Sequence, residues 1–322
     1  MEIPEATSDR IYKTLQKAQK IAIISHRHPD PDTLCSNLAL RVLLEKMGKD
    51  VTSACVDPVP ENCLFLPELK TFVDDFDPKD FDLFISVDAG STAQAAFPEK
   101  YPSILKKNFI NIDHHPSNDH YGTLPLVMED AASTTLIIYE LFGMWNEEIT
   151  IETATFLLFG LYFDTGSFMH SNTDAGVYKI ASELMRKGAR QDLIVQNLFK
   201  KHSIEKLKLW GKALDSAQLT DNRVIVAGVT AQEFSDCRAT SSDLGGLIDY
   251  LSTAKESKFA TLLSGDDSGQ IKGSLRTRHD NIDVSRIARD LGGGGHKKAS
   301  GFSIKGNLKR KTHWSITDKN PL

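Results

Sequence analysis

Carboxylate and imidazole side chains gather in the segment SHRHPDPDTL at 25–34, directly after an apolar run at 21–24. Similar groups follow three later apolar segments, which end before Asp88, before Asp113 and His114, and before Asp164. Oxygen and imidazole groups are the ligands that Mn²⁺ and Mg²⁺ accept, and imidazole also binds Zn²⁺. An aspartate after a strand is most often a helix cap or a turn residue, so each position alone is a weak signal. Four such groups of residues, each after an apolar segment, are expected by chance far less often than any one of them alone.

These groups form one site only if the fold brings them together. In an open parallel sheet, the loops after the carboxyl ends of the strands share one crevice. Several aspartates collected there without cations would repel one another and be forced to take up protons. Two divalent ions about 3.5–4 Å apart, sharing a bridging carboxylate, would remove this repulsion, activate water and polarise a phosphoryl oxygen. The loops contain no thiolate, which argues against a structural zinc site.

Alternating strand and helix patterns position these loops. Apolar runs predict strands at 21–25, 51–56, 81–87 and 109–112. Helical spacing predicts helices at 33–47 and 133–142. The segment 150–163 is apolar almost throughout and could be a strand or a helix by pattern alone, and its length favours a helix. Such alternation predicts an α/β fold with a doubly wound, mostly parallel sheet over about the first 190 residues.

Beyond this region the pattern changes. A charged amphipathic helix at 200–219 is predicted as a connector, and its lysine-rich face is typical of a solvated surface. A smaller α/β domain follows, with predicted strands at 224–229, 259–264 and 273–278 and a predicted helix at 284–291. The tail after Ile304 has weak periodicity, and we expect it to be loose or irregular.

A run of four glycines at 292–295 precedes His296 in this second region. Glycines let backbone N–H groups approach a phosphate closely, because no Cβ atom obstructs them. Arg276 and Arg278 can form bidentate contacts with phosphate oxygens. A flexible linker is the alternative interpretation, but the apolar helix and strand patterns on either side argue against it. The predicted substrate-binding residues are Arg276, Arg278, Gly293, Gly294, Gly295, His296 and Ser300.

Composition limits the partners and the compartment. A net charge of −5 argues against a broad grip on long duplex nucleic acid, but it allows a short anionic substrate held by local cations. The four cysteines lack CxxC spacing, which indicates a reduced compartment. No apolar stretch reaches the roughly 18–20 residues that span a bilayer. The acidic start MEIPEATSDR is unlike a secretory signal, so we expect a cytoplasmic protein without membrane contact.

The ordered motifs resemble a known superfamily. The segments SHRHPDPDTLCSNLAL, ISVDAG, NIDHHPSN and LYFDTGSF are similar to motifs I to IV of the DHH phosphoesterases. The segments GSLRTR and GGGGHKKASGF are similar to the DHHA1 domain of that superfamily. The compact length resembles its branch of bifunctional oligoribonucleases (nanoRNases) and pAp phosphatases. The resemblance implies a DHH catalytic metal-binding domain at 1–195, a helical linker at 196–222 and a DHHA1 substrate-binding domain at 223–322.

The resemblance also implies a centre of two Mn²⁺ ions, with Mg²⁺ as the alternative metal. His26 and Asp30 would ligate one ion, and Asp32 the other. Asp88 would bridge both ions. The shell of the second ion would be completed by His114 and Asp164.

Two residues of the third motif are predicted to act beside the metals, so that the predicted catalytic residues are Asp88, Asp113 and His115. Asp113 is expected to orient His114. His115 is expected to face the scissile phosphate, where an imidazolium could stabilise charge or protonate the leaving oxygen. The alternative, that His115 only forms a turn with Asp113, stays open.

The implied function is metal-dependent hydrolysis of short oligoribonucleotides to mononucleotides, with removal of phosphate from pAp as a second activity. The resemblance further implies a homodimer formed through the first domain. A phosphodiesterase for cyclic or linear dinucleotides (c-di-AMP or pApA) is the nearest alternative. A RecJ-like single-strand exonuclease is disfavoured because the chain lacks the length for an OB-type domain and lacks a basic groove. A nucleotide-binding module without turnover would not need a ligating side chain at every predicted position.

Overall fold

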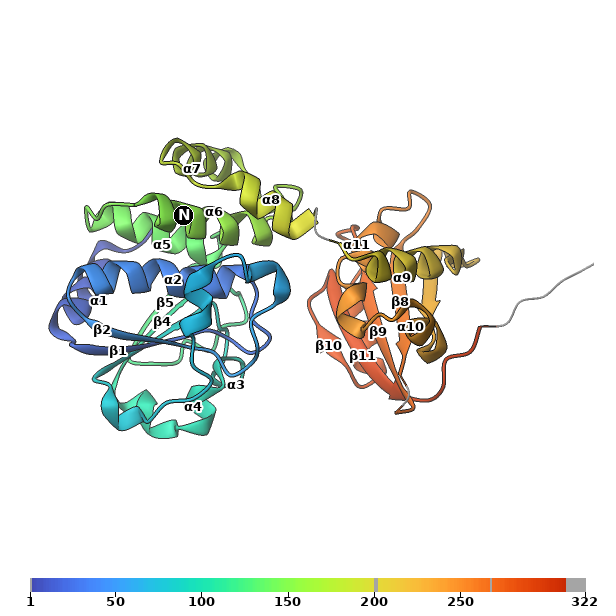
Figure 1. The fold of residues 1–322 in the computed structure, drawn as a ribbon, viewed down its shortest axis with the longest axis horizontal. Coiled ribbons are helices and arrows are strands. Elements are labelled where there is room, and N and C mark those ends of the chain that lie inside the picture. Colours follow the sequence, from blue (N-terminus) through green and yellow to red (C-terminus); the bar gives the residue numbers. More distant parts are fainter. Residues whose placement is uncertain (1, 200–201, 267, 311–322) are drawn as a thin grey trace, which may run out of the picture. The chain divides into compact units, whose positions relative to one another are not determined.

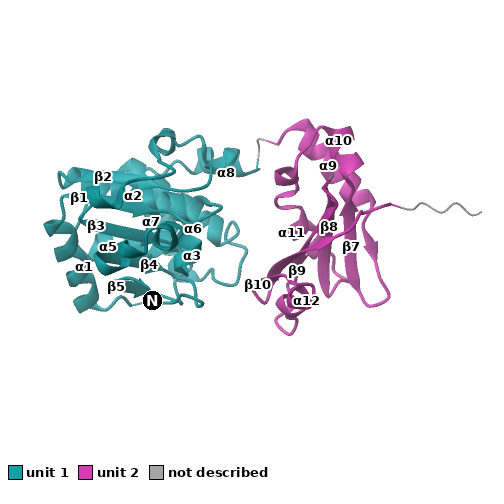
Figure 2. Cartoon of the chain, turned by 90° about the horizontal axis from the view of Figure 1, so that it is seen from below, with its two compact units in different colours: residues 1–201 teal, residues 202–322 magenta. Residues whose placement is uncertain are grey.

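The computed structural model describes residues 2–199, 202–266 and 268–310. It divides into two compact units, residues 1–201 and 202–322 (Figures 1 and 2). Each unit has its own sheet and its own hydrophobic core, so each is described by itself. Among the described residues, no helix combines the length and the apolar character needed to cross a bilayer.

The described part of the first unit contains a five-stranded parallel sheet in the order β2-β1-β3-β4-β5. Its strands are β1 Lys20–Ile24, β2 Asp50–Ala54, β3 Leu83–Val87, β4 Asn108–Asp113 and β5 Leu124–Val127. Alternate strand residues face opposite sides, because successive side chains of a strand point in opposite directions. Ile23 and Ile85 join the core under the long helices, whereas Ile24 and Phe84 join a smaller core on the other face. The predicted doubly wound parallel sheet is confirmed.

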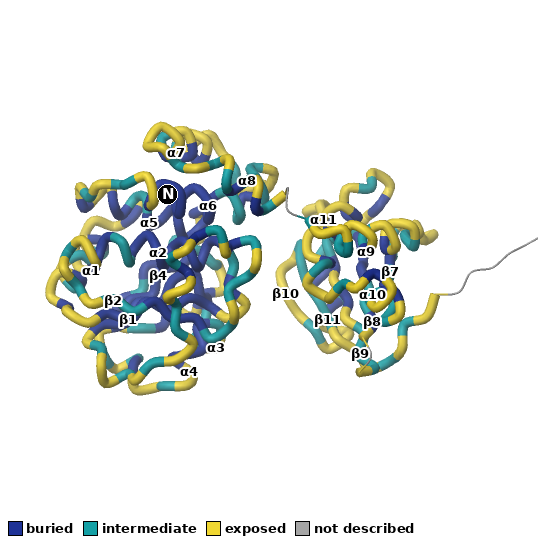
Figure 3. The backbone as a smooth tube through the Cα atoms, in the orientation of Figure 1, coloured by how far each residue is buried: buried dark blue, intermediate teal, exposed yellow. Residues whose placement is uncertain are grey.

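Helices cover both faces of this sheet (Figure 1). The α-helices of the unit are α1 Glu5–Lys17, α2 Pro31–Lys46, α3 Thr92–Ala95, α4 Phe97–Lys100, α5 Thr134–Met144, α6 Ile151–Asp164, α7 Ala175–Arg186 and α8 Gln191–Phe199. Short 3₁₀ helices lie at Glu61–Cys63, Pro67–Thr71, Pro78–Asp80 and Pro102–Lys106. Both α2 and α6 are largely buried, and they pack against each other in the centre of the unit (Figure 3). The ambiguous apolar segment at 150–163 is therefore a helix, as its length predicted.

The described part of the second unit contains a six-stranded mixed sheet in the order β10-β11-β9-β8-β7-β6. Its strands are β6 Gln218–Leu219, β7 Val224–Val229, β8 Phe259–Gly265, β9 Gln270–Arg276, β10 Gly294–Gly295 and β11 Ala299–Lys305. Its helices are α9 Ile204–Asp215, α10 Ala231–Cys237, the 3₁₀ helix Ser241–Leu244, α11 Leu247–Ser252 and α12 Val284–Asp290. The prediction of a smaller α/β unit is confirmed.

The segment predicted as a linker, 196–222, contains parts of both units. Helix α8 ends at Phe199 in the first unit, whereas α9 packs into the core of the second unit through Leu209 and Ala213. Of the tail predicted to be loose or irregular, Lys305 still belongs to β11 and residues 306–310 have no regular secondary structure, although Arg310 forms an ion pair of 2.6 Å with Asp215. The rest of the tail, 311–322, lies outside the described residues.

Candidate metal centre

The structure brings all six predicted metal ligands together at the carboxyl ends of β1, β3 and β4. Among the described residues, three groups have ligand atoms that lie within 4.8 Å of one another. The first group consists of His26, Asp30 and Asp88, and the second of Asp32, His114 and Asp164. The third group, Asp88, His114 and His115, shares residues with the first and the second. Residues that are far apart in the sequence therefore share one site in the first unit.

Asp88 belongs to the first group and also faces His114 of the second group. Its Oδ2 atom lies 3.5 Å from Nε2 of His26, and its Oδ1 atom lies 3.5 Å from Nε2 of His114. The side chain is 2% exposed, and Thr134 Oγ1 donates a hydrogen bond to Oδ1 (3.0 Å). The backbone φ of Asp88 is 58°, in the left-handed region that non-glycine residues rarely adopt. Such strain clusters at functional sites, and here it holds a carboxylate with one oxygen towards each group.

The first group combines a helix cap with a histidine. Oδ1 of Asp30 accepts hydrogen bonds from the backbone N–H groups of Asp32 and Thr33 (2.9 and 3.1 Å), so Asp30 caps α2. His26 donates from Nδ1 to the carbonyl of Arg27 (2.7 Å), which leaves Nε2 facing the carboxylates. Burial lowers the pKa of His26, but hydrogen bonds and charges of Asp30 and Asp88 outweigh this effect and raise the pKa to about 11. Asp30 can therefore cap α2 and still serve as the predicted metal ligand.

The second group is built around a fully buried carboxylate. Asp32 accepts hydrogen bonds from the backbone N–H groups of Thr134 and Thr135 (2.7 and 3.0 Å) and from Thr135 Oγ1 (2.7 Å). Nε2 of His114 lies 3.1 Å from Oδ2 of Asp164, the last residue of α6. The N-terminus of α5 and the C-terminus of α6 thus meet at Asp32.

The donor set fits divalent cations. Burial raises the pKa of Asp164 to about 6. Burial and the charges of Asp88 and Asp164 raise the pKa of Asp32 well above its usual range. Carboxylates held this close must share protons or bind cations. Gly160 leaves them the necessary space, because a Cβ atom there would lie 2.5 Å from Oδ1 of Asp32.

Asp113 has a different partner from the one predicted. Its Oδ1 atom lies 2.8 Å from Nδ1 of His115, whereas His114 donates from Nδ1 to the carbonyl of Ala131 (3.2 Å). The expectation that Asp113 orients His114 is therefore wrong. The second oxygen of Asp113 accepts a hydrogen bond of 2.6 Å from Asn118. Burial raises the pKa of Asp113, but the hydrogen bond and charge of His115 outweigh it, so the net shift is downward.

His115 belongs to the third group, together with Asp88 and His114. Its Nδ1 atom lies 3.7 Å from Oδ1 of Asp88. Burial lowers its pKa, but the hydrogen bond to Asp113 and the charge of Asp88 outweigh burial and raise it. His115 was predicted either to act on the scissile phosphate or only to form a turn with Asp113. Both roles include the hydrogen bond to Asp113, so this bond does not distinguish them, and the catalytic role of His115 stays a prediction.

Sequence reasoning missed four residues that support the centre: Asn118, Thr134, Thr135 and Gly160. A signal existed for two of them, because the segment ASTTL has the serine of a helix N-cap, and a helix N-terminus attracts anions. The sequence did not indicate which carboxylate would occupy that N-terminus. Asn118 lies within the segment NIDHHPSN, but the sequence analysis gave it no role. Gly160 carries no local signal, because the side chains that it faces belong to other helices.

The predicted substrate-binding residues of the second unit lie on β9, β10 and β11 and near their ends. Arg276 ends β9, and the exposed Arg278 follows it. Ser300 pairs with Leu275, whereas Arg276 pairs with Ala299. Side chains of neighbouring strand residues point to opposite faces, so Arg276 and Ser300 lie on different faces of the sheet. His296 opens the turn before β11, where its backbone N–H donates to the carbonyl of Ala299 (2.7 Å).

Two of the glycines have a packing reason that the sequence did not reveal. A Cβ atom at Gly293 would lie 2.1 Å from the carbonyl oxygen of Gly301, and one at Gly295 would lie 2.6 Å from Cα of Ser300. Both glycines therefore permit the close approach of β11. Gly294 has open space around its Cβ position. The hydroxyl of Ser300 is buried, and no hydrogen-bond partner for it is found among the residues that the structure describes.

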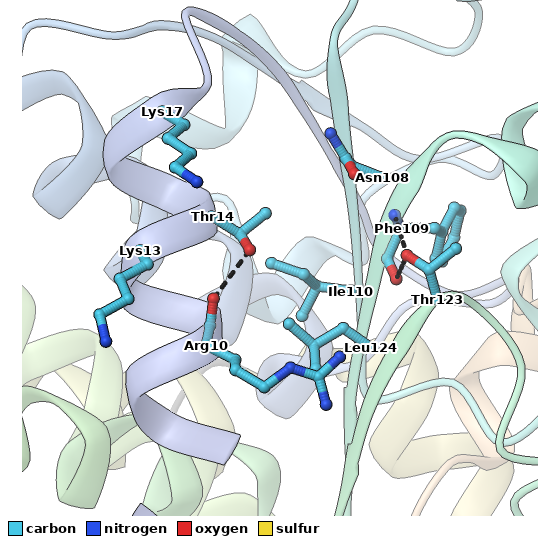
Figure 4. Close-up of a pocket in the computed structure, with 9 residues that line it drawn as sticks. All are labelled: Arg10, Lys13, Thr14, Lys17, Asn108, Phe109, Ile110, Thr123 and Leu124. Atoms are coloured by element: carbon cyan, nitrogen blue, oxygen red, sulfur yellow. Dashed lines mark hydrogen bonds between the residues drawn. The ribbon is translucent and has the colours of Figure 1, made fainter. Parts of the chain in front are cut away.

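A separate pocket lies near the amino-terminal ends of β4 and β5, where α1 packs against the sheet (Figure 4). Its volume is about 350 Å³. It is lined by Arg10, Lys13, Thr14, Lys17, Asn108, Phe109, Ile110, Thr123 and Leu124. None of the predicted site residues is among them, so this pocket is distinct from the candidate metal centre.

Comparisons with known proteins match both units. The model of the DHH family, N-terminal domain, matches residues 20–161, and that of the DHHA1 domain matches residues 221–313. The bifunctional oligoribonuclease and PAP phosphatase NrnA of Thermus thermophilus is 31% identical over 89% of this chain and 84% of its own length. An exopolyphosphatase-related protein from Bacteroides fragilis has a similar crystal structure, with a TM-score of 0.88, 25% identity and coverage of 95% of this chain and 93% of that one. RecJ of Thermus thermophilus in complex with Mn²⁺ shares the fold, with a TM-score of 0.57 and 16% identity, over 95% of this chain and 53% of its own.

Proposed function

The chain belongs to the DHH family, and from this premise we propose that it hydrolyses phosphoester bonds in short oligoribonucleotides and removes phosphate from pAp. The similarity to an oligoribonuclease and PAP phosphatase covers most of both chains, which supports this substrate class. The observation that carries the reaction type is the position of Asp88, whose two oxygens face two groups of ligands. A bridging carboxylate between two cations is the typical core of a two-metal phosphoesterase.

The residues of the centre divide into two sets. His26, Asp30 and Asp88 would hold one cation, and the other would be held by Asp32, Asp88, His114 and Asp164. When bound, such cations polarise a phosphoryl oxygen and lower the pKa of water. We propose Mn²⁺ as the metal, with Mg²⁺ as the alternative, because the carboxylates and imidazoles together form a mixed oxygen and nitrogen set.

His115 is proposed to act on the leaving group. Its Nδ1 atom is bonded to Asp113, which fixes the orientation of the ring. The opposite nitrogen, Nε2, is then the atom that can give a proton to the leaving oxygen. Asp113 and Asn118 would hold the ring in place without contacting the substrate.

The second unit is proposed to bind phosphates of the substrate. Arg276 and Arg278 would supply charged donors, and the backbone around Gly294 would supply N–H groups where no Cβ atom intervenes. We propose the catalytic role for 1–195 and the substrate-binding role for 223–322. The homodimer and the cytoplasmic location stay predictions.

The test is hydrolysis of three substrates side by side: pAp, a labelled RNA dinucleotide and c-di-AMP. Protein stripped with a chelator is assayed with and without Mn²⁺ or Mg²⁺. We expect metal-dependent turnover of pAp and the RNA dinucleotide, and we expect Asp88→Asn to lower kcat by on the order of 100-fold or more. Asp50→Asn, at the exposed first residue of β2, is the matched control and should keep full activity.

Two results would overturn the proposal. Equal activity of Asp88→Asn and the parent protein would exclude the two-metal centre. Fastest turnover of c-di-AMP would instead assign the protein to the cyclic dinucleotide phosphodiesterases.

A further inference from the structure

An aromatic pair lies on the surface of the second unit, on helices that the sequence did not connect with binding. The rings of Trp210 in α9 and Tyr250 in α11 contact each other edge to face, with 5.4 Å between their centroids. Nε1 of Trp210 donates to the backbone carbonyl of Asp243 (2.8 Å), which fixes the indole. Tyr250 is 62% exposed. The fixed indole of Trp210 thus supports the ring of Tyr250, and most of the surface of Tyr250 faces solvent.

Positive charge lies beside this pair, because Nζ of Lys206, one helical turn before Trp210 in α9, lies 5.3 Å from the centroid of the indole ring. The ring of His202 lies 6.0 Å from the same centroid. Burial and the charge of Lys206 lower the pKa of His202, so this residue adds an aromatic ring to the surface and not a second cation. Aromatic rings interleaved with cations are the usual surface for single-stranded nucleic acid, because bases stack on the rings and phosphates face the cations.

Arg276 connects this surface with the proposed phosphate-binding residues. Asp249, the residue before Tyr250 in α11, lies 2.7 Å from Nε of Arg276. The contact is made through Nε, and the guanidinium has further N–H donors on its two Nη atoms, which suit phosphate oxygens. Asp249 and Tyr250 are consecutive residues of α11, so Arg276 is held against the helix that carries Tyr250.

We propose that Tyr250, supported by Trp210, stacks on a nucleobase of the substrate while Arg276 binds a phosphate of the same oligoribonucleotide. This inference rests on the proposed function and adds to it a subsite that recognises the base. Stacking accepts any base, because every base has a π-face. The subsite would therefore favour nucleotides over other phosphoesters without selecting a sequence.

The test uses the full-length protein with Mn²⁺ and three substrates, an RNA dinucleotide and its two abasic analogues, each of which lacks one of the two bases. Tyr250→Ala should raise the KM for the dinucleotide about 10-fold and leave kcat nearly unchanged. Tyr250→Phe, which keeps the ring, should restore the parental KM. Tyr178→Ala removes another exposed aromatic ring, in the first unit, and should leave KM unchanged. With the parent protein, one of the two abasic analogues should have a KM about 10-fold above that of the dinucleotide, because it lacks the stacked base. For that analogue, Tyr250→Ala should cause no further rise in KM.

The outcomes separate the two proposals. If the parent protein hydrolyses no oligoribonucleotide, both the proposed function and this subsite are wrong. If it does, but Tyr250→Ala leaves KM unchanged, only the subsite is wrong. An equal rise in KM for the dinucleotide and for both abasic analogues would also overturn the subsite, because it would indicate a structural effect.

Discussion

The side chain of Asn118 lies in a buried network behind the candidate metal centre. Its amide donates to Oδ2 of Asp113 (2.6 Å) and to Oδ1 of Asn111 (2.9 Å), and its own Oδ1 accepts from the backbone N–H of His120 (2.6 Å). Asp113 in turn bonds to His115. Through this chain of contacts, a residue outside the ligand groups determines where the imidazole of His115 lies.

We predict that Asn118→Ala lowers kcat for pAp by about 10–100-fold with little change in KM, because Asp113 and His115 lose their fixed orientation. Leaving Asp113 with one donor fewer should also cost about 1–3 kcal/mol of unfolding free energy. Steady-state kinetics and chemical denaturation measure the two effects. Asn197→Ala, which removes a buried amide in α8, is the control and should lose stability without the loss in kcat. Equal loss of kcat in both variants would argue against a positioning role for Asn118.

Three helices meet at the metal centre, and their packing decides its shape. Asp32 comes from the first turn of α2, the N–H groups that bind it from α5, and Asp164 from the end of α6. Gly160, one turn before Asp164, faces Asp32 and Thr135 so closely that a Cβ atom would lie 2.5 Å from both side chains. The helix contact is therefore as much a part of the centre as the ligands are.

We predict that Gly160→Ala costs about 1–3 kcal/mol of unfolding free energy, because the new methyl group pushes α6 away from α2. The same displacement moves Asp164, so the affinity for Mn²⁺ should fall by about 10–100-fold. Thermal denaturation and calorimetric titration with Mn²⁺ measure these changes. Gly143→Ala in α5 is the matched control, since its Cβ position has open space and the added methyl should stabilise the helix slightly. An unchanged Mn²⁺ affinity in Gly160→Ala would contradict the prediction.

The two units have separate cores, so the metal centre should influence them unequally. All six proposed ligands belong to the first unit, whereas the core around Leu209 and Leu247 belongs to the second. A ligand that binds only the folded form stabilises the unit that contains its site. Cation binding also removes the repulsion among the buried carboxylates, which the protein otherwise relieves by taking up protons.

We predict that Mn²⁺ at about 100 times its Kd stabilises the first unit by about 2.7 kcal/mol. Hydrogen exchange read by mass spectrometry should show slower exchange in α2, β3 and β4, with exchange in β7 and β8 unchanged. The variant Asp88→Asn should lose most of this protection. Equal protection of both units, or protection that persists in Asp88→Asn, would mean that Mn²⁺ acts elsewhere.

Much of the fold was predictable, because strand and helix patterns repeat over a few residues. Apolar runs located β1 to β4 and β7 to β9, helical spacing located α2 and α5, and the length of the apolar segment at 150–163 located α6. The four-residue strand β5 was missed, because LPLV is short and contains a proline. The linker was misplaced as one segment, because a charged helix on the surface of a unit has the same pattern as a free connector.

The sequence by itself determined which side chains can bind cations and that five of the six ligands follow predicted strands, which is enough to place those five at one edge of a parallel sheet; the sixth, Asp164, ends a helix. Tertiary structure alone decided their partners. Asp32 binds residues 102 and 103 positions away, Asp113 pairs with His115 and not with His114, and Arg276 and Ser300 lie on opposite faces of their sheet. The physical reason is that a residue pattern reflects local periodicity, whereas hydrogen bonds and close contacts depend on how distant segments pack.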